Sequence, residues 1–244
     1  MPNGYDKLAS ALDRFQEAHF WLHMMEQHYH SADQFRWHLN VFLKALKEVP
    51  DMISMALQND RDFPAWFRTQ RETLFDDPLM WILSKRRDQV VHREMLVPKS
   101  RADVGITELR GMKLGMTFPL HPLEDSDAGM ERYLRSVKRS GDSKRADFLG
   151  ILMLDEDSLP CVRREWRLAE FDEELVDLCA RAWLRTSETL VSVLRWLGED
   201  PPPQTLSCRR GHQAVLFKTY NREALIQRLT AMPPADTKQV TDGS

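Results

Sequence analysis

Apolar residues recur at helical spacing over most of this chain, and the pattern breaks down only in its middle. A stripe of residues three and four positions apart runs from about residue 5 to 30, and a second runs from about 33 to 59. Each predicts an amphipathic helix. Because only a few residues connect them, we expect the two helices to pack antiparallel. A third stripe, from about 171 to Gly198, predicts a long helix that completes the same bundle.

Two shorter helices are predicted between the second stripe and the middle of the chain, at about 63–74 and 78–95. The second begins with Pro78, which is favourable in a first helical turn, and Asp76 or Asp77 can cap its free amides. Its helical spacing predicts one buried face. The residues on that face are Leu79, Ile82, Leu83, Arg86, Val90 and Val91.

The middle of the chain, residues 98–170, contains glycines and short β-leaning runs instead of helical stripes. The runs 115–120 and 148–154 predict strands or hairpins. The basic stretch 131–139 with Lys144 and Arg145 is typical of a solvated loop or short helix, with phosphate binding as the alternative. Further on, 214–217 predicts a short strand and 222–229 a last small helix.

The predicted fold class is therefore mainly α, an antiparallel helical bundle. A small β-containing excursion is inserted between the fourth and the last long helices. The expected organisation is a helical bundle core at 1–97, the excursion at 98–170, a long helix with a short strand and helix at 171–232, and a disordered tail at 233–244.

Composition limits the partners and the compartment. The net charge is −3 and the pI about 6.3, so nucleic acid would need a local basic patch. Three widely spaced cysteines favour a reducing compartment without disulfides. Cys208 and His212 could supply two zinc ligands, but a zinc site needs about four and the sequence has no second pair. Without a signal segment or a long apolar run, we expect a cytoplasmic protein with no membrane partner.

The first helix carries several histidines that a metal site would need. His19 and His23, like Glu26 and His30, are four residues apart and so share a helix face. A carboxylate-bridged bundle site requires Glu-x-x-His pairs on further helices, and none recurs here. We therefore expect these histidines to be solvated or packed at a helix edge, with no metal and no cofactor.

The candidate catalytic residues lie on the predicted helix 78–95, where Arg87, Asp88 and His92 form an Arg-Asp-x-x-x-His string. Asp88 and His92 are helix neighbours, so the carboxylate can accept a ring N–H and fix the imidazole tautomer. Arg87 offers a planar fork of donors that suits a phosphate. Arg14 and His19 show the same spacing without the acidic neighbour, so the spacing alone is not specific.

This string resembles the Arg-x4-His motif of the HEPN superfamily, whose members are helical bundles. The flanking residues are similar to those of bacterial members, with Trp37-His38-Leu39-Asn40-x-Phe42-Leu43 and Asp62-Phe63-x-x-Trp66 preceding the string. The likeness covers residues 5–97. It implies a metal-independent endoribonuclease that acts on RNA as a homodimer, as a toxin or defence component with an antitoxin or another protein partner.

On this resemblance, RNA would be cleaved by its own 2′-hydroxyl, leaving a 2′,3′-cyclic phosphate. His92 would transfer the proton, Arg87 would hold the phosphate with Arg86 as the fallback, and Asp88 would orient the imidazole. The alternative is a non-catalytic bundle that binds a protein partner or a nucleotide, in which Arg87 and Asp88 form a structural pair.

Overall fold

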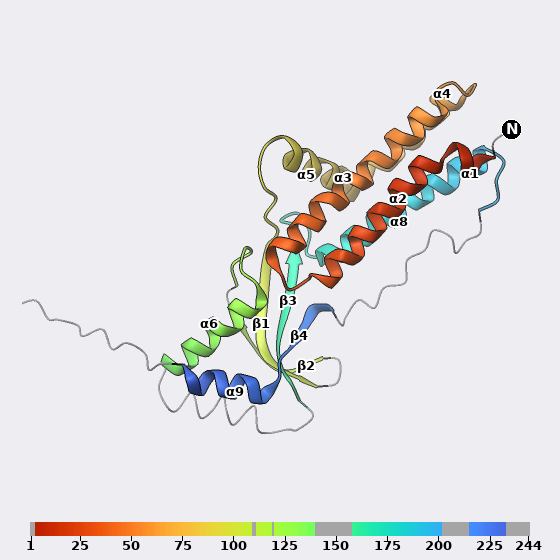
Figure 1. The fold of residues 1–244 in the computed structure, drawn as a ribbon. Helices are drawn as coiled ribbons and strands as arrows, with labels where there is room; N and C mark the ends of the chain where they lie inside the picture. The colour runs from red at the N-terminus through yellow and green to blue at the C-terminus, as the bar shows by residue number, and fades with distance from the viewer. Residues whose placement is uncertain (1–2, 109–110, 119, 140–157, 202–214, 233–244) are drawn as a thin grey trace, which may run out of the picture. The chain divides into compact units, whose positions relative to one another are not determined.

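The computed structural model describes residues 3–108, 111–118, 120–139, 158–201 and 215–232, without the side chains of residues 92, 108, 111, 113, 114 and 116. The described chain is mainly helical with a small β-containing part, as predicted, and its strands form a four-stranded sheet (Figure 1). It divides into two compact units, and each unit is built from two separate segments. The helical unit comprises Met1–Lys99 and Trp166–Gly211, and the sheet unit comprises Ser100–Glu165 and His212–Ser244.

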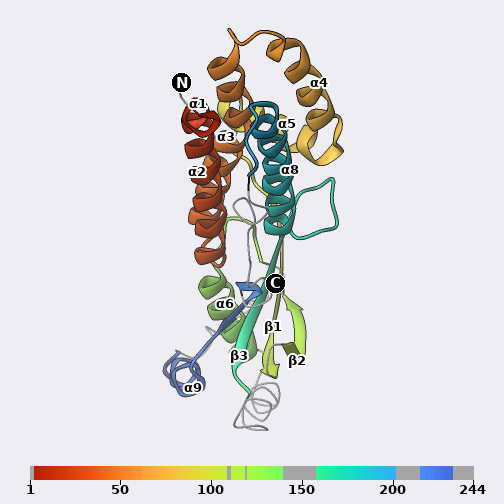
Figure 2. The same ribbon diagram turned by 90° about the vertical axis from the view of Figure 1, so that its right-hand side faces the viewer.

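Three long helices form the body of the helical unit. The helices α2 and α3 are an antiparallel hairpin, and α8 lies beside them, as the two views show (Figure 2). Each has one buried apolar face, which is why the helical stripes located all three. The helices of this unit are α1 (Gly4–Lys7), α2 (Ala9–Gln27), α3 (Ala32–Leu57), α4 (Phe63–Asp76), α5 (Pro78–His92) and α8 (Leu175–Trp196).

Two buried tryptophans join the late segment of the helical unit to its N-terminal hairpin. The ring of Trp183, on α8, stacks on Phe15 with 4.3 Å between centroids, and its indole N–H donates to the Phe15 carbonyl at 3.1 Å. Trp166 stacks on Phe35 at 4.6 Å and donates to the Tyr29 carbonyl at 2.9 Å. Each indole therefore buries a large apolar surface while its polar N–H keeps a partner.

The start of α8 depends on a buried carboxylate. Glu174 caps the helix by accepting hydrogen bonds from the amides of Val176 at 2.8 Å and Asp177 at 3.2 Å, and it also accepts from the Tyr29 hydroxyl at 3.0 Å. The sequence predicted a start at about residue 171, and the helix in fact begins at Leu175. Burial raises the pKa of Glu174 to about 7, although these hydrogen bonds oppose the shift.

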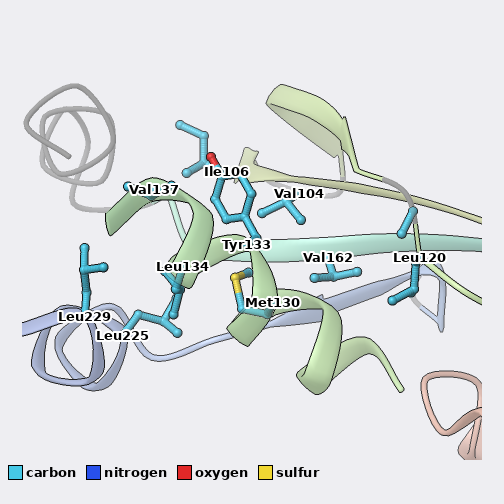
Figure 3. Close-up of a cluster of buried hydrophobic side chains, with 11 residues drawn as sticks. Val104, Ile106, Leu120, Met130, Tyr133, Leu134, Val137, Val162, Leu225 and Leu229 are labelled. Carbon is cyan, nitrogen blue, oxygen red and sulfur yellow. The ribbon is translucent and has the colours of Figure 1, made fainter. Parts of the chain in front are cut away.

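The described part of the sheet unit contains a four-stranded sheet in the order β2-β1-β3-β4 and the helices α6 and α9. The hairpin β1–β2 is antiparallel, with a register shift between Ile106 and Thr107, and β3–β4 is antiparallel as well. Helices α6 and α9 pack on one face of it (Figure 3). The elements are β1 (Lys99–Glu108), β2 (Gly111–Phe118), α6 (Ser126–Arg139), β3 (Pro160–Arg167), β4 (Phe217–Thr219) and α9 (Arg222–Ala231).

The core of the sheet unit explains why α6 is a helix. Met130, Tyr133, Leu134 and Val137 lie on one helix face and pack on Val162 and its neighbours in the sheet (Figure 3). These apolar residues are three and four positions apart, so they form one face of a helix, and the basic residues of the segment lie outside that face. The expectation of a solvated loop or short helix at 131–139 is therefore corrected to a 14-residue amphipathic helix.

Several predicted boundaries also change. The strand predicted at 115–120 begins earlier, at Gly111, and the strand predicted at 214–217 is observed as Phe217–Thr219. Strands β1 and β3 were not predicted. The strand predicted at 148–154 and the disordered tail at 233–244 lie outside the described residues, as do Lys144 and Arg145. None of the described helices is long and apolar enough to cross a membrane.

Replacing the indoles separates their packing from their hydrogen bonds. A phenyl ring fills much of the same space but cannot donate to the carbonyl, so Trp166→Phe and Trp183→Phe should each lower the free energy of unfolding by about 1–3 kcal/mol. Urea denaturation of the parent and both variants measures the losses. A variant as stable as the parent would contradict the role given to its indole hydrogen bond.

The buried carboxyl of Glu174 predicts a pH effect on stability. Its pKa is raised in the folded state, so the folded protein binds this proton more tightly and loses stability as pH rises from about 5 to about 7. Glu174→Gln should remove that loss, so the variant gains on the parent by roughly 2–3 kcal/mol over this interval. Denaturation of both proteins at several pH values tests it. A parent-to-variant difference that stays constant with pH would contradict the prediction.

Candidate functional site

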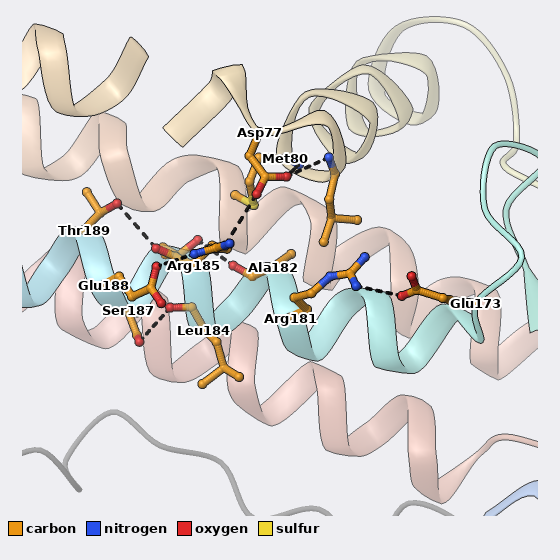
Figure 4. A network of polar contacts seen from close by, with 12 residues as sticks. Asp77, Met80, Glu173, Arg181, Ala182, Leu184, Arg185, Ser187, Glu188 and Thr189 are labelled. Atoms are coloured by element: carbon orange, nitrogen blue, oxygen red, sulfur yellow. Dashed lines mark hydrogen bonds and ion pairs between the residues drawn. The ribbon is translucent and has the colours of Figure 1, made fainter. Parts of the chain in front are cut away.

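Helix α5 carries the predicted site and is anchored at its N-terminus. Asp77 caps it, accepting hydrogen bonds from the amides of Leu79 at 2.8 Å and Met80 at 3.4 Å, which confirms one of the two predicted caps. Arg185 of α8 reaches the same carboxylate, with 3.4 Å between Nε and Oδ2 (Figure 4). The first turn of α5 is thus fixed to α8.

The two halves of α5 differ in burial. Leu79, Met80 and Leu83 are buried in the first half, and Val90 is only partly buried in the second. Val91 is exposed, so its predicted place on the buried face is wrong. The reason is that the packed face covers little more than the first two turns. The second half of α5 therefore presents its polar side chains at the surface of the helical unit.

Asp88 ties the second half of α5 to α3. One carboxylate oxygen, Oδ1, accepts from Lys47 Nζ at 2.6 Å and from the Arg87 guanidinium at 3.1 Å. The hydrogen bond from Lys47 is the main cause that lowers the pKa of Asp88, and that from Arg87 adds to it. The sequence did not identify Lys47, because 41 residues separate it from its partner.

The three residues of the predicted catalytic string are placed as follows. Arg87 and Asp88 are in contact, and the Nε atom of Arg87 is buried with no hydrogen-bond partner among the described residues. The backbone of His92 ends α5, and its side chain lies outside the described residues. The role of Asp88 in orienting His92 therefore stays a prediction. Arg86, the fallback, is bonded to Gln89 at 2.7 Å and to Glu170.

An open groove of about 820 Å³ runs along this surface of α5. Its wall includes the indole of Trp81, which is 49% exposed, and Lys85, whose Nζ lies 3.4 Å from the indole centroid. Arg93 is exposed at its far end. The groove is lined by Trp81, Ile82, Lys85, Arg86, Asp88, Gln89, Arg93, Glu94 and Glu170.

The charges in the groove are not equally compensated. The carboxylates are each bonded within the unit: Asp88 to Lys47, Glu94 to the Gln89 amide at 2.6 Å, and Glu170 to Arg86. Among the described side chains, no carboxylate lies within ion-pair distance of Lys85 or Arg93. Within the described part of the chain, the groove therefore offers two cations without a carboxylate partner beside an exposed aromatic ring.

The described residues contain no group of three or more His, Cys, Asp or Glu side chains that could hold a metal ion. Cys208 and His212 lie outside the described residues. Cys161 and Cys179 are buried, and burial raises the pKa of the Cys161 thiol to about 12, which disfavours the reactive thiolate.

Comparison with known families matches residues 7–213 to the family of bacteriophage lambda protein ea47. The chain belongs to this family. The match spans α2 to α8 and includes the whole of α5, so the resemblance to the HEPN superfamily is wrong. That resemblance depended on short strings, and the Arg-x4-His spacing of Arg14 and His19 shows how readily such a string arises. No curated protein and no solved structure matches the chain.

In this ea47-family chain, the groove residues that sequence reasoning missed are Trp81, Lys85 and Arg93. A signal for two of them was present, because Trp81 and Lys85 are four apart and so share a helix face. The buried-face pattern drew attention to Ile82 and Arg86 instead. Only the structure shows that this face of α5 borders a groove.

A double-mutant cycle tests the structural role of the Lys47–Asp88 pair. Both side chains are partly exposed, so solvent screens their attraction, and we expect a coupling free energy of about 0.5 kcal/mol. Lys47→Met, Asp88→Asn and the double variant would be compared by urea denaturation at low and high salt. The coupling should shrink in high salt. A coupling of zero at low salt would show that the pair does not stabilise the contact of α5 with α3.

Proposed function

We propose that the helical unit binds single-stranded RNA without cleaving it, and that the groove along α5 holds one nucleotide of the strand. The observation that carries the proposal is the half-exposed indole of Trp81 beside the uncompensated cations of Lys85 and Arg93. An aromatic platform with neighbouring cations is the usual arrangement for holding a base and its phosphate. The groove volume of about 820 Å³ is within the range of small-ligand sites.

Stacking of a base on the Trp81 indole is expected to contribute more free energy than the present contact of that ring with Lys85. An exposed cation–π contact such as that of Lys85 on the indole contributes about 0.5–1 kcal/mol. A base stacked on an aromatic side chain contributes about 1–3 kcal/mol. A base can therefore displace the Lys85 ammonium from the ring, and the released ammonium is then close enough to pair with the phosphate of the same nucleotide.

The charge of the whole chain is consistent with a local site of this kind. The net charge of −3 provides no general attraction for a polyanion. Affinity must then come from the few cations of the groove, and binding should be weak and dependent on salt. The homodimer and the antitoxin were expectations of the HEPN resemblance, and nothing else supports them.

Fluorescence anisotropy with a labelled 12-nucleotide RNA tests the proposal. Trp81→Ala should weaken binding by about 5- to 150-fold, the equivalent of one lost stacking contact. Lys85→Ala and Arg93→Ala should each reduce the slope of log affinity against log salt by about 0.7. Trp37→Ala is the matched control, because that indole is 56% exposed on α3 and lines no part of the groove.

The same samples separate binding from catalysis. After incubation in chelator, the RNA should remain intact on a denaturing gel. Cleavage by the parent that is lost in His92→Ala would replace the proposal with the nuclease hypothesis for Arg87, Asp88 and His92. If Trp81→Ala binds RNA as tightly as the parent and as Trp37→Ala, the groove is not the binding site. DNA of the same sequence shows whether the 2′-hydroxyl contributes.

A further inference from the structure

Two histidines on α2, remote in sequence from the groove on α5, point their ring nitrogens at each other. His19 and His23 are one helical turn apart, and 3.1 Å separates their Nε2 atoms. The rings meet edge to face, with 4.5 Å between centroids and an interplanar angle of 75°. The two Nε2 atoms thus meet at one point beside the helix.

The far side of one ring is held by a carboxylate. Glu26 Oε2 lies 2.7 Å from His23 Nδ1, so it accepts the Nδ1–H and leaves the Nε2 lone pair facing His19. The Glu26 side chain is only 12% exposed, which favours one orientation. A carboxylate in this position is the usual second ligand shell of a metal-bound histidine, where it fixes the tautomer and raises the basicity of the ring.

The other ring is held by packing. His19 stacks on the indole of Trp183 at 4.5 Å and 23°, and that indole is itself fixed by its hydrogen bond to the Phe15 carbonyl. The His23 side chain is 42% exposed, so an ion from solvent can reach the pair. Both imidazoles are therefore oriented before any ligand arrives, and little side-chain entropy remains to be lost on binding.

We propose that His19 and His23 chelate one divalent transition-metal ion through their Nε2 atoms, with Glu26 as the positioning residue and water in the remaining coordination positions. Two nitrogens bound at about 2.0–2.1 Å to one ion lie about 3 Å apart, which matches the observed separation. In the metal-free protein, the two rings share a hydrogen bond through the same atoms. The ion takes the place of the His19 Nε2 hydrogen, which passes through solvent to Nδ1 of the same ring, so both rings stay neutral and each presents an Nε2 lone pair to the ion.

The ligand set also selects the ion. With two imidazoles and no third protein ligand among the described residues, the site is an open N,O site of the kind that suits Cu²⁺ or Ni²⁺ in tetragonal geometry. Zn²⁺ needs a more complete tetrahedral set to bind tightly. Affinity should therefore follow the order Cu²⁺ above Ni²⁺ and Zn²⁺.

Calorimetric titration of the full chain with Cu²⁺, together with electron paramagnetic resonance, tests the site. We expect one ion per chain, a spectrum with two imidazole nitrogens, and an unchanged solution mass. His23→Ala should abolish this binding, and Glu26→Gln should weaken it roughly 10- to 100-fold. His28→Ala, at the residue that follows the last turn of α2, and His212→Ala should bind as the parent does, and circular dichroism checks that each variant is folded.

The outcomes are distinct. Binding that persists unchanged in His23→Ala would overturn the site, and so would loss of binding in His212→Ala alone. An affinity unchanged in Glu26→Gln would overturn the positioning role of the carboxylate. One ion for every two chains, with a doubled mass, would overturn the assignment of water to the remaining positions. None of these results affects RNA binding, because the pair and the α5 groove share no residue.

Discussion

The helical unit depends on the burial of two indoles whose N–H groups still find acceptors. Trp166 and Trp183 come late in the chain, and each indole N–H donates a hydrogen bond to a carbonyl of the first helical hairpin. Trp166 donates to Tyr29, and Trp183 donates to Phe15. An indole buried without its hydrogen bond would cost free energy, so these two bonds determine where the late segment can pack. The same constraint fixes Trp183 as the surface on which His19 stacks.

Packing of this kind leaves the second half of α5 available for binding. The apolar face of α5 is used in its first turns, where Asp77 and Arg185 fix the helix to α8. Beyond them the helix is held by a partly exposed ion pair to Lys47, which contributes little stability. A surface held by weak polar contacts can keep an aromatic ring and cations exposed, because it is not required to bury them.

The spacing of apolar residues predicted the helices because it marks the buried face of each helix. All the residues of such a face lie within one short stretch of the sequence. This spacing located α2, α3 and α8 to within a few residues, and it placed α5 correctly with Asp77 as one of two caps. It missed the helical stripe of α6 beneath a run of basic residues. It also missed β3, whose neighbours in the sheet come from distant segments, and it missed β1, although the partner strand β2 follows it directly along the chain. The contacts of Asp88 with Lys47 and of Trp166 with Tyr29 were likewise not predictable, since each joins residues with no sequence relation.

The alternation of the two units along the chain has a consequence for synthesis. The chain leaves the helical unit after Lys99, returns at Trp166, and leaves it again after Gly211. A ribosome that has released only the first hundred residues has made the hairpin but neither of the indoles that cover it, so its apolar face is exposed for as long as the next segment takes to appear. The sheet likewise waits for β4 and α9, which come after the second helical segment. Neither unit can therefore be obtained as a single continuous fragment.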